Sequence, residues 1–269
     1  MPADVDETPL VLVTGAAGRI GTYLRRGLPS MGWRLRLLDI HPCDNDSTVE
    51  STVVADIRDA DGLDRAMRGV GAVVHLAGIP TEAPFDQIIG ANIEGTWQVF
   101  DAARRAGVER IVYAGSNHAV GFAPRSEPLA VDMTPRPDTN YGVSKAFGEA
   151  LARFYFDRHH VRVACLRIGS CADRPTNRRM LSTWLSPGDA VRLFDACLRA
   201  PNLDFAVVYG VSANTRGWWD LEPGHALGFE PCDDAEAYAD DVLAAHLASA
   251  LDAADDATVG GRWTTFSPD

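Results

Sequence analysis

Short apolar runs alternate with amphipathic stretches along the first 170 residues. The stretches carry apolar residues at helical spacing, whereas the runs are apolar on both faces of a strand. This alternation of buried strands and helices predicts an α/β fold with a doubly wound parallel sheet. The predicted strands are Leu10–Val13, Arg34–Asp39, Thr52–Asp56, Ala72–Leu76, Arg110–Ala114 and Arg162–Ile168, and the predicted helices follow Arg19 and cover residues 58–69, 85–106 and 141–159.

The pattern changes after Ser170. Residues 171–186 contain three arginines and have the composition of a loop. Beyond them, Pro187 suits the first turn of a helix. The elements predicted for this part are a helix from Pro187 to about Ala200, a strand at Phe205–Gly210 and an acid-rich amphipathic helix over residues 233–251.

The length of 269 residues suits one large α/β domain or two small ones. The last stretch of roughly 100 residues would not easily bury a core of its own. We therefore expect a single domain over residues 1–269, in which residues 1–170 form the core and residues 171–269 form a smaller extension that covers it. Hydrophobic residues at 46% and charged residues at 23% are typical of a soluble globular protein.

Charge narrows the possible partners. The formal net charge of −12 opposes the phosphates of nucleic acids and the surfaces of anionic membranes. No apolar run approaches the roughly 20 residues that span a bilayer. The first eight residues contain Asp4, Asp6 and Glu7, where a signal peptide would be basic and then apolar. We expect no nucleic acid partner, no membrane insertion and a cytoplasmic location.

Cysteine and histidine spacing points to neither disulfides nor metal. The cysteine number is odd, no two cysteines have C-x-x-C spacing, and the histidines form no H-x-x-x-H array. We expect reduced cysteines and no metal site. The five cysteines are Cys43, Cys165, Cys171, Cys197 and Cys232.

A glycine-rich turn follows the first predicted strand and opens the first helix. Its sequence is T-G-A-A-G-R-I-G, with glycines at positions 15, 18 and 21. These glycines allow a tight turn, close approach of a pyrophosphate and close packing of the helix on the sheet. A plain strand–helix turn is the alternative, but both flanking elements favour a dinucleotide site in a Rossmann-type sheet. The residues expected to bind the cofactor here are Gly15, Ala17, Gly18, Arg19, Ile20 and Gly21.

The second predicted strand ends in an acid, Asp39. A carboxylate there accepts hydrogen bonds from a ribose 2′-hydroxyl and repels a 2′-phosphate, which predicts NAD rather than NADP. The alternative is that Asp39 merely caps the loop. Further cofactor contacts are expected at the ends of later strands: Asp56 and Ile57 beside the adenine, Leu76, Ala77 and Gly78 beside a ribose, and Ile168.

Tyr141 and Lys145 lie one helical turn apart, and Lys145 is the sole lysine beside 24 arginines. A phenol with a pKa near 10 is a poor base at neutral pH. An ammonium about 5 Å away favours the phenolate by roughly 3 kcal/mol at an effective dielectric of about 20. Arginine is a poor substitute for such a compact charge. The pair therefore predicts a tyrosine base, with a chance survival of one lysine as the alternative.

Polar residues follow the fifth and sixth predicted strands, at the edge where ligands bind in such sheets. Ser116 could hold a reacting oxygen beside Tyr141, while Asn117 and His118 offer further contacts; His118 could also be a loop residue without a role. Either Arg178 or Arg179 could bind a carboxylate bidentately, or both could be solvated. Three tryptophans could line a sugar site or pack in the core: Trp184, Trp218 and Trp219.

The glycine motif, Ser116 and the Y-x-x-x-K pair make residues 10–170 resemble the extended, sugar-active branch of the short-chain dehydrogenase/reductases. A closer resemblance, to the uronate dehydrogenase family, covers nearly the whole chain. It rests on the segments S-N-H from 116, R-I-G-S-C from 167, R-M-L-S-T-W from 179 and G-W-W-D from 217. That family oxidises the anomeric carbon of galacturonate or glucuronate with NAD and forms the aldarolactone.

The resemblance implies roles for individual residues. Tyr141 would be the base, Lys145 its partner and cofactor ligand, and Ser116 the hydroxyl that positions the substrate. The chain departs from the family pattern at Pro80, where a serine is expected, so that only a backbone contact to substrate remains there. The remaining residues expected to line the sugar pocket are Asn117, His118, Ser170 and Arg179.

Two other functions remain open from the sequence. A nucleotide-sugar epimerase or dehydratase uses the same Tyr–Lys pair but needs room for a nucleoside diphosphate. A non-catalytic, NAD-binding redox sensor would need no Tyr–Lys pair at all. We also expect a homo-oligomer, although the sequence fixes neither the subunit number nor the preference between galacturonate and glucuronate.

Overall fold

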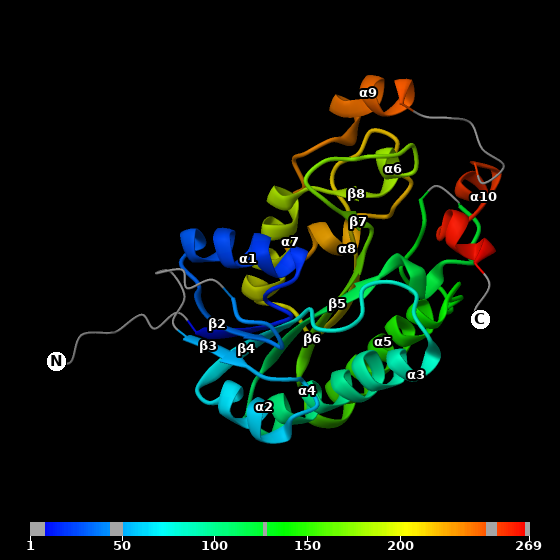
Figure 1. Ribbon diagram of the computed structural model, residues 1–269. Helices are drawn as coiled ribbons and strands as arrows, with labels where there is room; N and C mark the ends of the chain where they lie inside the picture. The colour runs from blue at the N-terminus through cyan, green and yellow to red at the C-terminus, as the bar shows by residue number, and fades with distance from the viewer. Residues whose placement is uncertain (1–8, 44–50, 126–127, 246–251, 267–269) are drawn as a thin grey trace.

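The computed structural model describes residues 9–43, 51–125, 128–245 and 252–266. The main element is a seven-stranded sheet in the order β3-β2-β1-β4-β5-β6-β9, with every neighbouring pair parallel (Figure 1). This confirms the predicted α/β class and doubly wound parallel sheet. The strands are β1 (Leu10–Thr14), β2 (Arg34–Asp39), β3 (Ser51–Val54), β4 (Val70–His75), β5 (Arg110–Ser116), β6 (Arg162–Ile168) and β9 (Phe205–Gly210).

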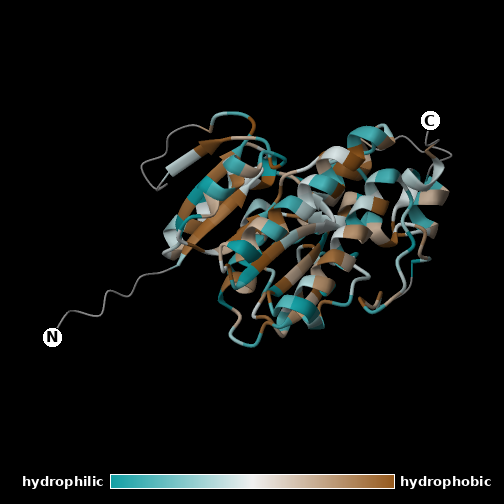
Figure 2. Ribbon diagram, turned by 90° about the horizontal axis from the view of Figure 1, so that it is seen from below, coloured by the Kyte–Doolittle hydropathy of each residue, from teal (hydrophilic) through white to brown (hydrophobic). Residues whose placement is uncertain are grey.

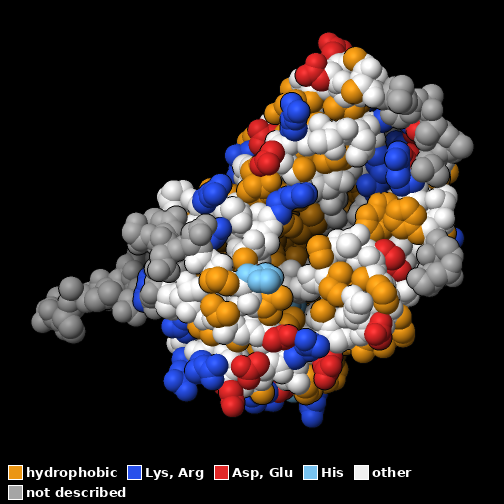
Figure 3. All heavy atoms as spheres, viewed as in Figure 1, with side chains coloured by type: hydrophobic (Ala, Val, Ile, Leu, Met, Phe, Trp, Pro, Cys, Tyr) orange, Lys and Arg blue, Asp and Glu red, His pale blue; other side chains and the backbone are white. Residues whose placement is uncertain are grey.

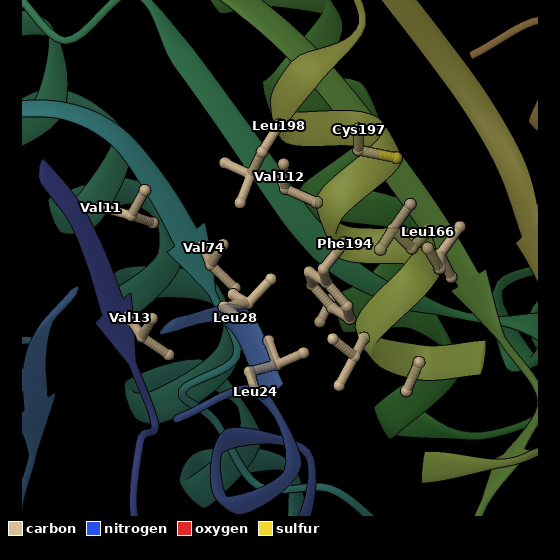
Figure 4. Packing of buried hydrophobic residues seen from close by; sticks show 14 of the residues in the cluster. Val11, Val13, Leu24, Leu28, Val74, Val112, Leu166, Phe194, Cys197 and Leu198 are labelled. Carbon is tan, nitrogen blue, oxygen red and sulfur yellow. The ribbon is translucent and has the colours of Figure 1, made fainter. Parts of the chain in front are cut away.

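Helices cover both faces of this sheet because its strands are apolar on both sides. On one face, α1 and α7 enclose a core that includes Leu24 and Phe194 (Figure 4). On the other face, α2, α4 and α5 enclose a second core that includes Leu63 and Phe100. The strands consist mainly of hydrophobic residues, whereas the helices contain both hydrophobic and hydrophilic residues (Figure 2). The helices are α1 (Arg19–Gly27), α2 (Ala60–Met67), α4 (Gly95–Arg105), α5 (Asn140–His159) and α7 (Pro187–Arg199).

Two predicted elements of the N-terminal part differ in the structure. The third strand ends at Val54 rather than at Asp56, because Asp56 turns back to accept hydrogen bonds from the backbone and guanidinium of Arg58. The predicted helix over residues 85–106 is divided into α3 (Phe85–Ile88), a π-helical turn η2 (Ile89–Glu94) and α4. Such a π turn reorients the side chains that it carries and is frequent at functional sites.

The segment after β6 contains more regular structure than the predicted loop. Short strands β7 (Ser170–Cys171) and β8 (Trp184–Leu185) pair with each other, and α6 (Met180–Thr183) lies between them. Prediction of a loop over residues 171–186 was therefore wrong, because a two-residue pairing between distant segments leaves no periodic signal. The three tryptophans, Trp184, Trp218 and Trp219, are buried in two apolar clusters.

The acidic C-terminal part also departs from the predicted single helix over residues 233–251. It begins with a 3-10 turn, η4 (Ala235–Tyr238), and continues as α9 (Ala239–Ala244), while the predicted end lies outside the described residues. Three further elements were not predicted: α8 (Glu222–His225), α10 (Asp252–Ala257) and the 3-10 turn η5 (Gly261–Thr265). None of the described helices combines the length and apolar composition needed to cross a membrane.

The strand order reverses between β1 and β4, where consecutive crossovers run to opposite sides. In an open parallel sheet, this reversal leaves a crevice at the carboxyl ends of the strands, which is the usual ligand site. Thr14, His75, Ser116 and Ile168 are the last residues of four central strands. The loops that carry the predicted site residues therefore meet at one edge of the sheet.

Candidate active site

The glycine-rich turn between β1 and α1 is packed too closely for side chains. Gly15 has φ of +72°, and a Cβ there would lie 2.6 Å from the backbone nitrogen of Ala77. A Cβ on Gly21 would lie 2.6 Å from the carbonyl oxygen of Gly15. The turn thus brings the start of α1 against the loop after β4. It forms a cradle that fits a pyrophosphate, with the first-turn N–H groups of α1 available to an anion.

Asp39 at the end of β2 is buried beside this cradle. Its Oδ2 accepts a hydrogen bond from the backbone of Ala17 at 2.9 Å, and its Oδ1 accepts one from His41 at 2.9 Å. The carboxylate therefore does cap the local backbone, which was the alternative interpretation. Each carboxylate oxygen keeps a second lone pair, so the same group can still accept from a ribose hydroxyl. The position suits an NAD ribose.

The loop after β4 lines the same crevice. Gly78 has φ of +145°, and a Cβ there would lie 2.9 Å from Oδ1 of Asn92. Asn92 is buried on the π turn, accepts from the backbone of Ile79 at 2.7 Å, and donates to Ser144 of α5 at 3.1 Å. Sequence reasoning missed Asn92, which ties the cofactor-side loop to the helix that carries Tyr141. Ile57, expected beside the adenine, directs its side chain into the apolar core.

Tyr141 and Lys145 lie on the first turns of α5, both 8% exposed. The Nζ atom of Lys145 lies 5.5 Å from the centre of the Tyr141 ring and donates to the carbonyl of Ala114 at 2.8 Å. Ser116 follows at the end of β5, and its hydrogen bond to Tyr141 lowers the pKa of the phenol. The structure thus brings together all three residues predicted to carry the chemistry.

Burial dominates the proton affinities of this pair. It raises the pKa of Tyr141 to about 12, with an opposing effect of Ser116 and a further increase from the charge of Asp138. It lowers the pKa of Lys145 to about 8. The expected depression of the Tyr141 pKa by Lys145 is therefore not found in the free protein, where Ser116 is the group that lowers this pKa and desolvation disfavours phenolate and ammonium alike.

His118 is held by a partner that the sequence did not reveal. Its Nδ1 lies 2.7 Å from Oδ2 of Asp138, whose side chain is fully buried. The imidazole packs against the ring of Trp263 from η5 at 4.4 Å and lies 6.0 Å from the ring of Tyr141. Trp263 of the C-terminal segment thus lies beside both His118 and Tyr141. No local pattern in the sequence predicts this contact.

The two candidate arginines differ in their surroundings. Arg178 is half-exposed and paired with Asp256 at 2.9 Å. Arg179 is more deeply buried and donates to the carbonyl of Val259 at 2.7 Å; no carboxylate of the described residues lies within 4.0 Å of its guanidinium. Desolvation lowers the pKa of Arg179 to about 10. The charges of Asp255 and Asp138 oppose this decrease without a direct ion pair to the guanidinium. A desolvated cation without a directly bonded carboxylate is suited to bind an anion.

The remaining predicted substrate residues lie in loops and short elements after β4, β5 and β6. Ser170 of β7 bonds to Thr183 at the end of α6 at 3.0 Å, and the Thr183 hydroxyl donates to the carbonyl of Arg179. The side-chain nitrogen of Asn117 is buried and has no partner among the described residues, as expected of a donor reserved for a ligand. Pro80 is exposed in the loop after β4.

Glu82 in this loop was also missed from the sequence. Its carboxylate accepts hydrogen bonds from the backbone nitrogens of Asn140 at 3.2 Å and Tyr141 at 2.9 Å. The surface of the molecule is hollowed between the sheet edge and the part that contains β7, β8 and α6, with Lys or Arg side chains near the rim (Figure 3).

Comparison with known proteins agrees with this geometry. Residues 11–187 match the NAD dependent epimerase/dehydratase family. A uronate dehydrogenase of Agrobacterium fabrum is 48% identical over 85% of this chain and 86% of its own length. An NAD-dependent glucose-6-phosphate dehydrogenase of Haloferax volcanii is 40% identical over 84% of this chain and 94% of its own.

The overall structure is also similar to a solved one. A crystal structure of a mutant uronate dehydrogenase from Agrobacterium tumefaciens, complexed with NAD, superposes with a TM-score of 0.91 and 42% identity, covering 97% of this chain and 99% of the other. Together, these matches cover both the sheet and the C-terminal part that closes the site. The chain belongs to the NAD-dependent epimerase/dehydratase family and, within it, to the uronate dehydrogenases.

Proposed function

We propose that this protein oxidises the anomeric carbon of a free hexuronate, galacturonate or glucuronate, to the aldarolactone with NAD. The observation that carries the proposal is the combination of a buried Tyr141–Lys145 pair with the desolvated guanidinium of Arg179, which forms no direct ion pair within the described part of the chain. The Tyr141–Lys145 pair is suited to remove a hydroxyl proton, and the guanidinium of Arg179 is suited to bind a carboxylate. A uronate carries both groups, at opposite ends of one sugar.

The residues of the chain divide the reaction between them. Tyr141 takes the proton of the anomeric hydroxyl, while Ser116 holds the same oxygen and Lys145 stabilises the phenolate. The glycine cradle and Asp39 would hold the dinucleotide, and Lys145 its nicotinamide ribose. When bound, NAD accepts the hydride that leaves C1. Burial of Tyr141 and Lys145 keeps water away from the reacting atoms and strengthens the attraction between their charges.

The carboxylate at C6 distinguishes a uronate from its parent hexose. We assign its recognition to Arg179, because Arg178 is already neutralised by Asp256 and the guanidinium of Arg179 is not paired in this way. A hydrogen bond to a charged group contributes about 1.5–3 kcal/mol. Arg179→Ala should therefore lower kcat/KM for a uronate by roughly 10- to 150-fold.

The test measures NADH formation with galacturonate, glucuronate and their neutral parent sugars. Arg178→Ala is the matched control, since it removes an arginine from the same loop and should change uronate turnover little. Neutral sugars, already poor substrates, should lose much less than uronates in Arg179→Ala. Equal losses on charged and neutral sugars would show that Arg179 shapes the loop without binding the carboxylate.

The same assay separates the alternatives. An epimerase or dehydratase would act on a nucleotide sugar and would keep tightly bound NAD through purification. A redox sensor would bind NAD without turnover of any sugar. Faster turnover of hexose 6-phosphates than of uronates would instead place the chain with its phosphate-sugar relative, and would require a second cation beside Arg179.

Self-association and location complete the proposal. Large apolar side chains are exposed on neighbouring helices, with Trp97 of α4 44% exposed and Phe154 of α5 52% exposed. Such side chains favour contact with another subunit, so we propose a homo-oligomer, to be measured by light scattering on the wild type and on Phe154→Glu.

A cytoplasmic location is supported by five free cysteine thiols.

A further inference from the structure

We propose that Asp138 is a positioning residue that fixes His118 in the Nδ1–H tautomer, so that Nε2 accepts a hydrogen bond from a hydroxyl of the sugar. The proposal deepens the function proposed above and rests on it for the identity of the ligand. Its basis is a contact between two buried side chains, at the edge of the sheet where the predicted site residues meet.

The geometry of the pair sets the direction of its hydrogen bond. Oδ2 of Asp138 lies 2.7 Å from Nδ1 of His118. The other carboxylate oxygen, Oδ1, accepts a hydrogen bond from the hydroxyl of Thr139 at 3.2 Å. An ionised carboxylate can only accept hydrogen bonds, so Nδ1 must carry a proton. A neutral imidazole with its proton on Nδ1 has a bare lone pair on Nε2.

The carboxylate of Asp138 has no room to turn. Three glycines from different segments surround it, and a Cβ on Gly121 or Gly260 would overlap its atoms. A Cβ on Gly142 would lie 3.1 Å from its Oδ1. Gly121 follows the turn after β5, Gly142 lies in the first turn of α5, and Gly260 directly precedes η5. The backbone nitrogen of Gly260 donates a hydrogen bond to the carbonyl of Gly121. Close packing therefore holds the acceptor for His118 in one orientation.

The second oxygen of Asp138 links His118 to the helix of the base. Thr139, which donates to it, is the N-cap of α5 and accepts from the backbone of Gly142 at 2.9 Å. Tyr141 lies within this capped turn. One carboxylate thus sets the position of the imidazole relative to the phenol, and the two rings lie 6.0 Å apart.

Nε2 of His118 is the ring atom left for a ligand. It has no hydrogen-bond partner among the described residues, and the His118 side chain keeps 9% of its surface exposed while that of Asp138 keeps none. A bare nitrogen attracts a hydroxyl donor and repels a carboxylate. His118 and Arg179 would therefore bind different ends of a sugar acid, a ring hydroxyl and the carboxylate, and Trp263 would cover the imidazole.

Nitrogen NMR on the ¹⁵N-histidine-labelled protein tests the tautomer directly. In the wild type at the pH of the activity assay, we expect a protonated Nδ1 and a bare Nε2 for His118, assigned with His118→Ala. Addition of galacturonate to the NADH-bound protein should shift Nε2 and leave Nδ1 in place. A proton on Nε2 in the sugar-free protein, or an Nε2 signal unmoved at saturating galacturonate, overturns the proposal.

A double-mutant cycle tests the route of the effect. With His118 intact, Asp138→Asn should lower kcat/KM for a uronate by about tenfold or more. In the His118→Ala background, the same change should cost less than about threefold, because the residue through which it acts is already gone. Equal losses in both backgrounds would mean that Asp138 acts through the fold rather than through His118.

Two controls keep these outcomes distinct. NAD affinity and the unfolding midpoint should be near those of the wild type in Asp138→Asn, and if that variant does not fold, the wild-type NMR experiment still decides. A protein that turns over no uronate refutes the proposed function but not the tautomer, which is read without turnover. Rescue of the kinetics by Asp138→Glu is not expected, because the glycine cage excludes a longer side chain.

Discussion

Tyr141 has to take a proton in a place that disfavours its charged form. Burial raises its pKa to about 12, while the neighbouring Lys145, with a pKa lowered to about 8, is still mainly charged at neutral pH. Deprotonation of Tyr141 becomes easier as the pH increases, whereas the supporting ammonium is lost above about 8. Activity should therefore increase between pH 6 and 8, and flatten where Lys145 loses its proton.

Lys145→Arg tests whether a positive charge alone is sufficient. The Nζ atom of the buried Lys145 side chain donates to Ala114 at 2.8 Å, and a planar guanidinium is a poor substitute for such a compact charge. We expect a large fall in kcat and a shift of the pH–rate profile to higher pH. Near-normal kinetics would mean that the single lysine of the chain is an accident of composition.

Asp39 should control the choice of cofactor. A 2′-phosphate would meet its carboxylate, so the wild type should strongly prefer NAD to NADP. Asp39→Ala should weaken NAD binding. It should also decrease the ratio of kcat/KM with NAD to kcat/KM with NADP. Asp61→Ala, which removes an exposed acid on α2, is the control and should change that ratio much less. Equal use of NADP by the wild type would contradict the role of Asp39.

Helix α5 depends on capping groups from two segments. Thr139 accepts from Gly142, and Glu82 accepts from the backbone nitrogens of Asn140 and Tyr141. Loss of a cap costs about 1 kcal/mol of stability. Glu82→Ala should lower the free energy of unfolding by about this amount, measured with urea, and should also lower kcat, because it loosens the backbone of Tyr141. Asp86→Ala, an exposed acid on α3, is the control; an unchanged kcat in Glu82→Ala would limit Glu82 to stability.

Elements with strong local patterns were predictable, and those set by distant partners were not. The residue range of β2 and the start of α7 at Pro187 agree with prediction, since apolar periodicity and a first-turn proline are local signals. The β7–β8 pair and the π turn arise from contacts between distant segments. For the same reason, Tyr141, Lys145 and Ser116 were found from motifs, while Glu82, Asn92, Asp138 and Trp263, which act through distant partners, were not.

At the scale of the whole molecule, the C-terminal segment is tied to the site by charge. Asp255 pairs with Arg262, and Asp256 pairs with Arg125 and Arg178. The backbone of Val259, between these aspartates and η5, orients Arg179. These pairs bind three arginines directly, whereas Arg179 feels the charge of Asp255 without a direct ion pair and keeps its guanidinium available to the substrate. We propose on this basis that residues 171–269 serve chiefly to cover the substrate, although α7 and β9 also complete the sheet layers.

The stability of the whole fold should depend on one buried histidine. His75, at the end of β4, bonds through its two ring nitrogens to Thr14 of β1 at 2.8 Å and Thr96 of α4 at 3.1 Å. Burial, assisted by the charge of Lys145, lowers its pKa from 6.5 to about 3. Below pH 6.5 the unfolded chain therefore binds a proton that the folded protein refuses. Stability falls as the pH decreases through 6.5 and continues to fall until about 3.

The size of this effect can be measured without extremes of pH. Each pH unit within that window corresponds to 1.36 kcal/mol for one proton, so His75 should cost about 2 kcal/mol between pH 7.5 and pH 5. Urea unfolding at pH 5, 6 and 7 should give a smaller decrease for His75→Gln than for the wild type, whatever the stability of the variant at pH 7. His159→Gln, which removes an exposed histidine, should keep the wild-type slope. If His75→Gln keeps that slope as well, His75 is protonated in the folded protein, and the neutral bridge between β1, β4 and α4 does not exist in solution.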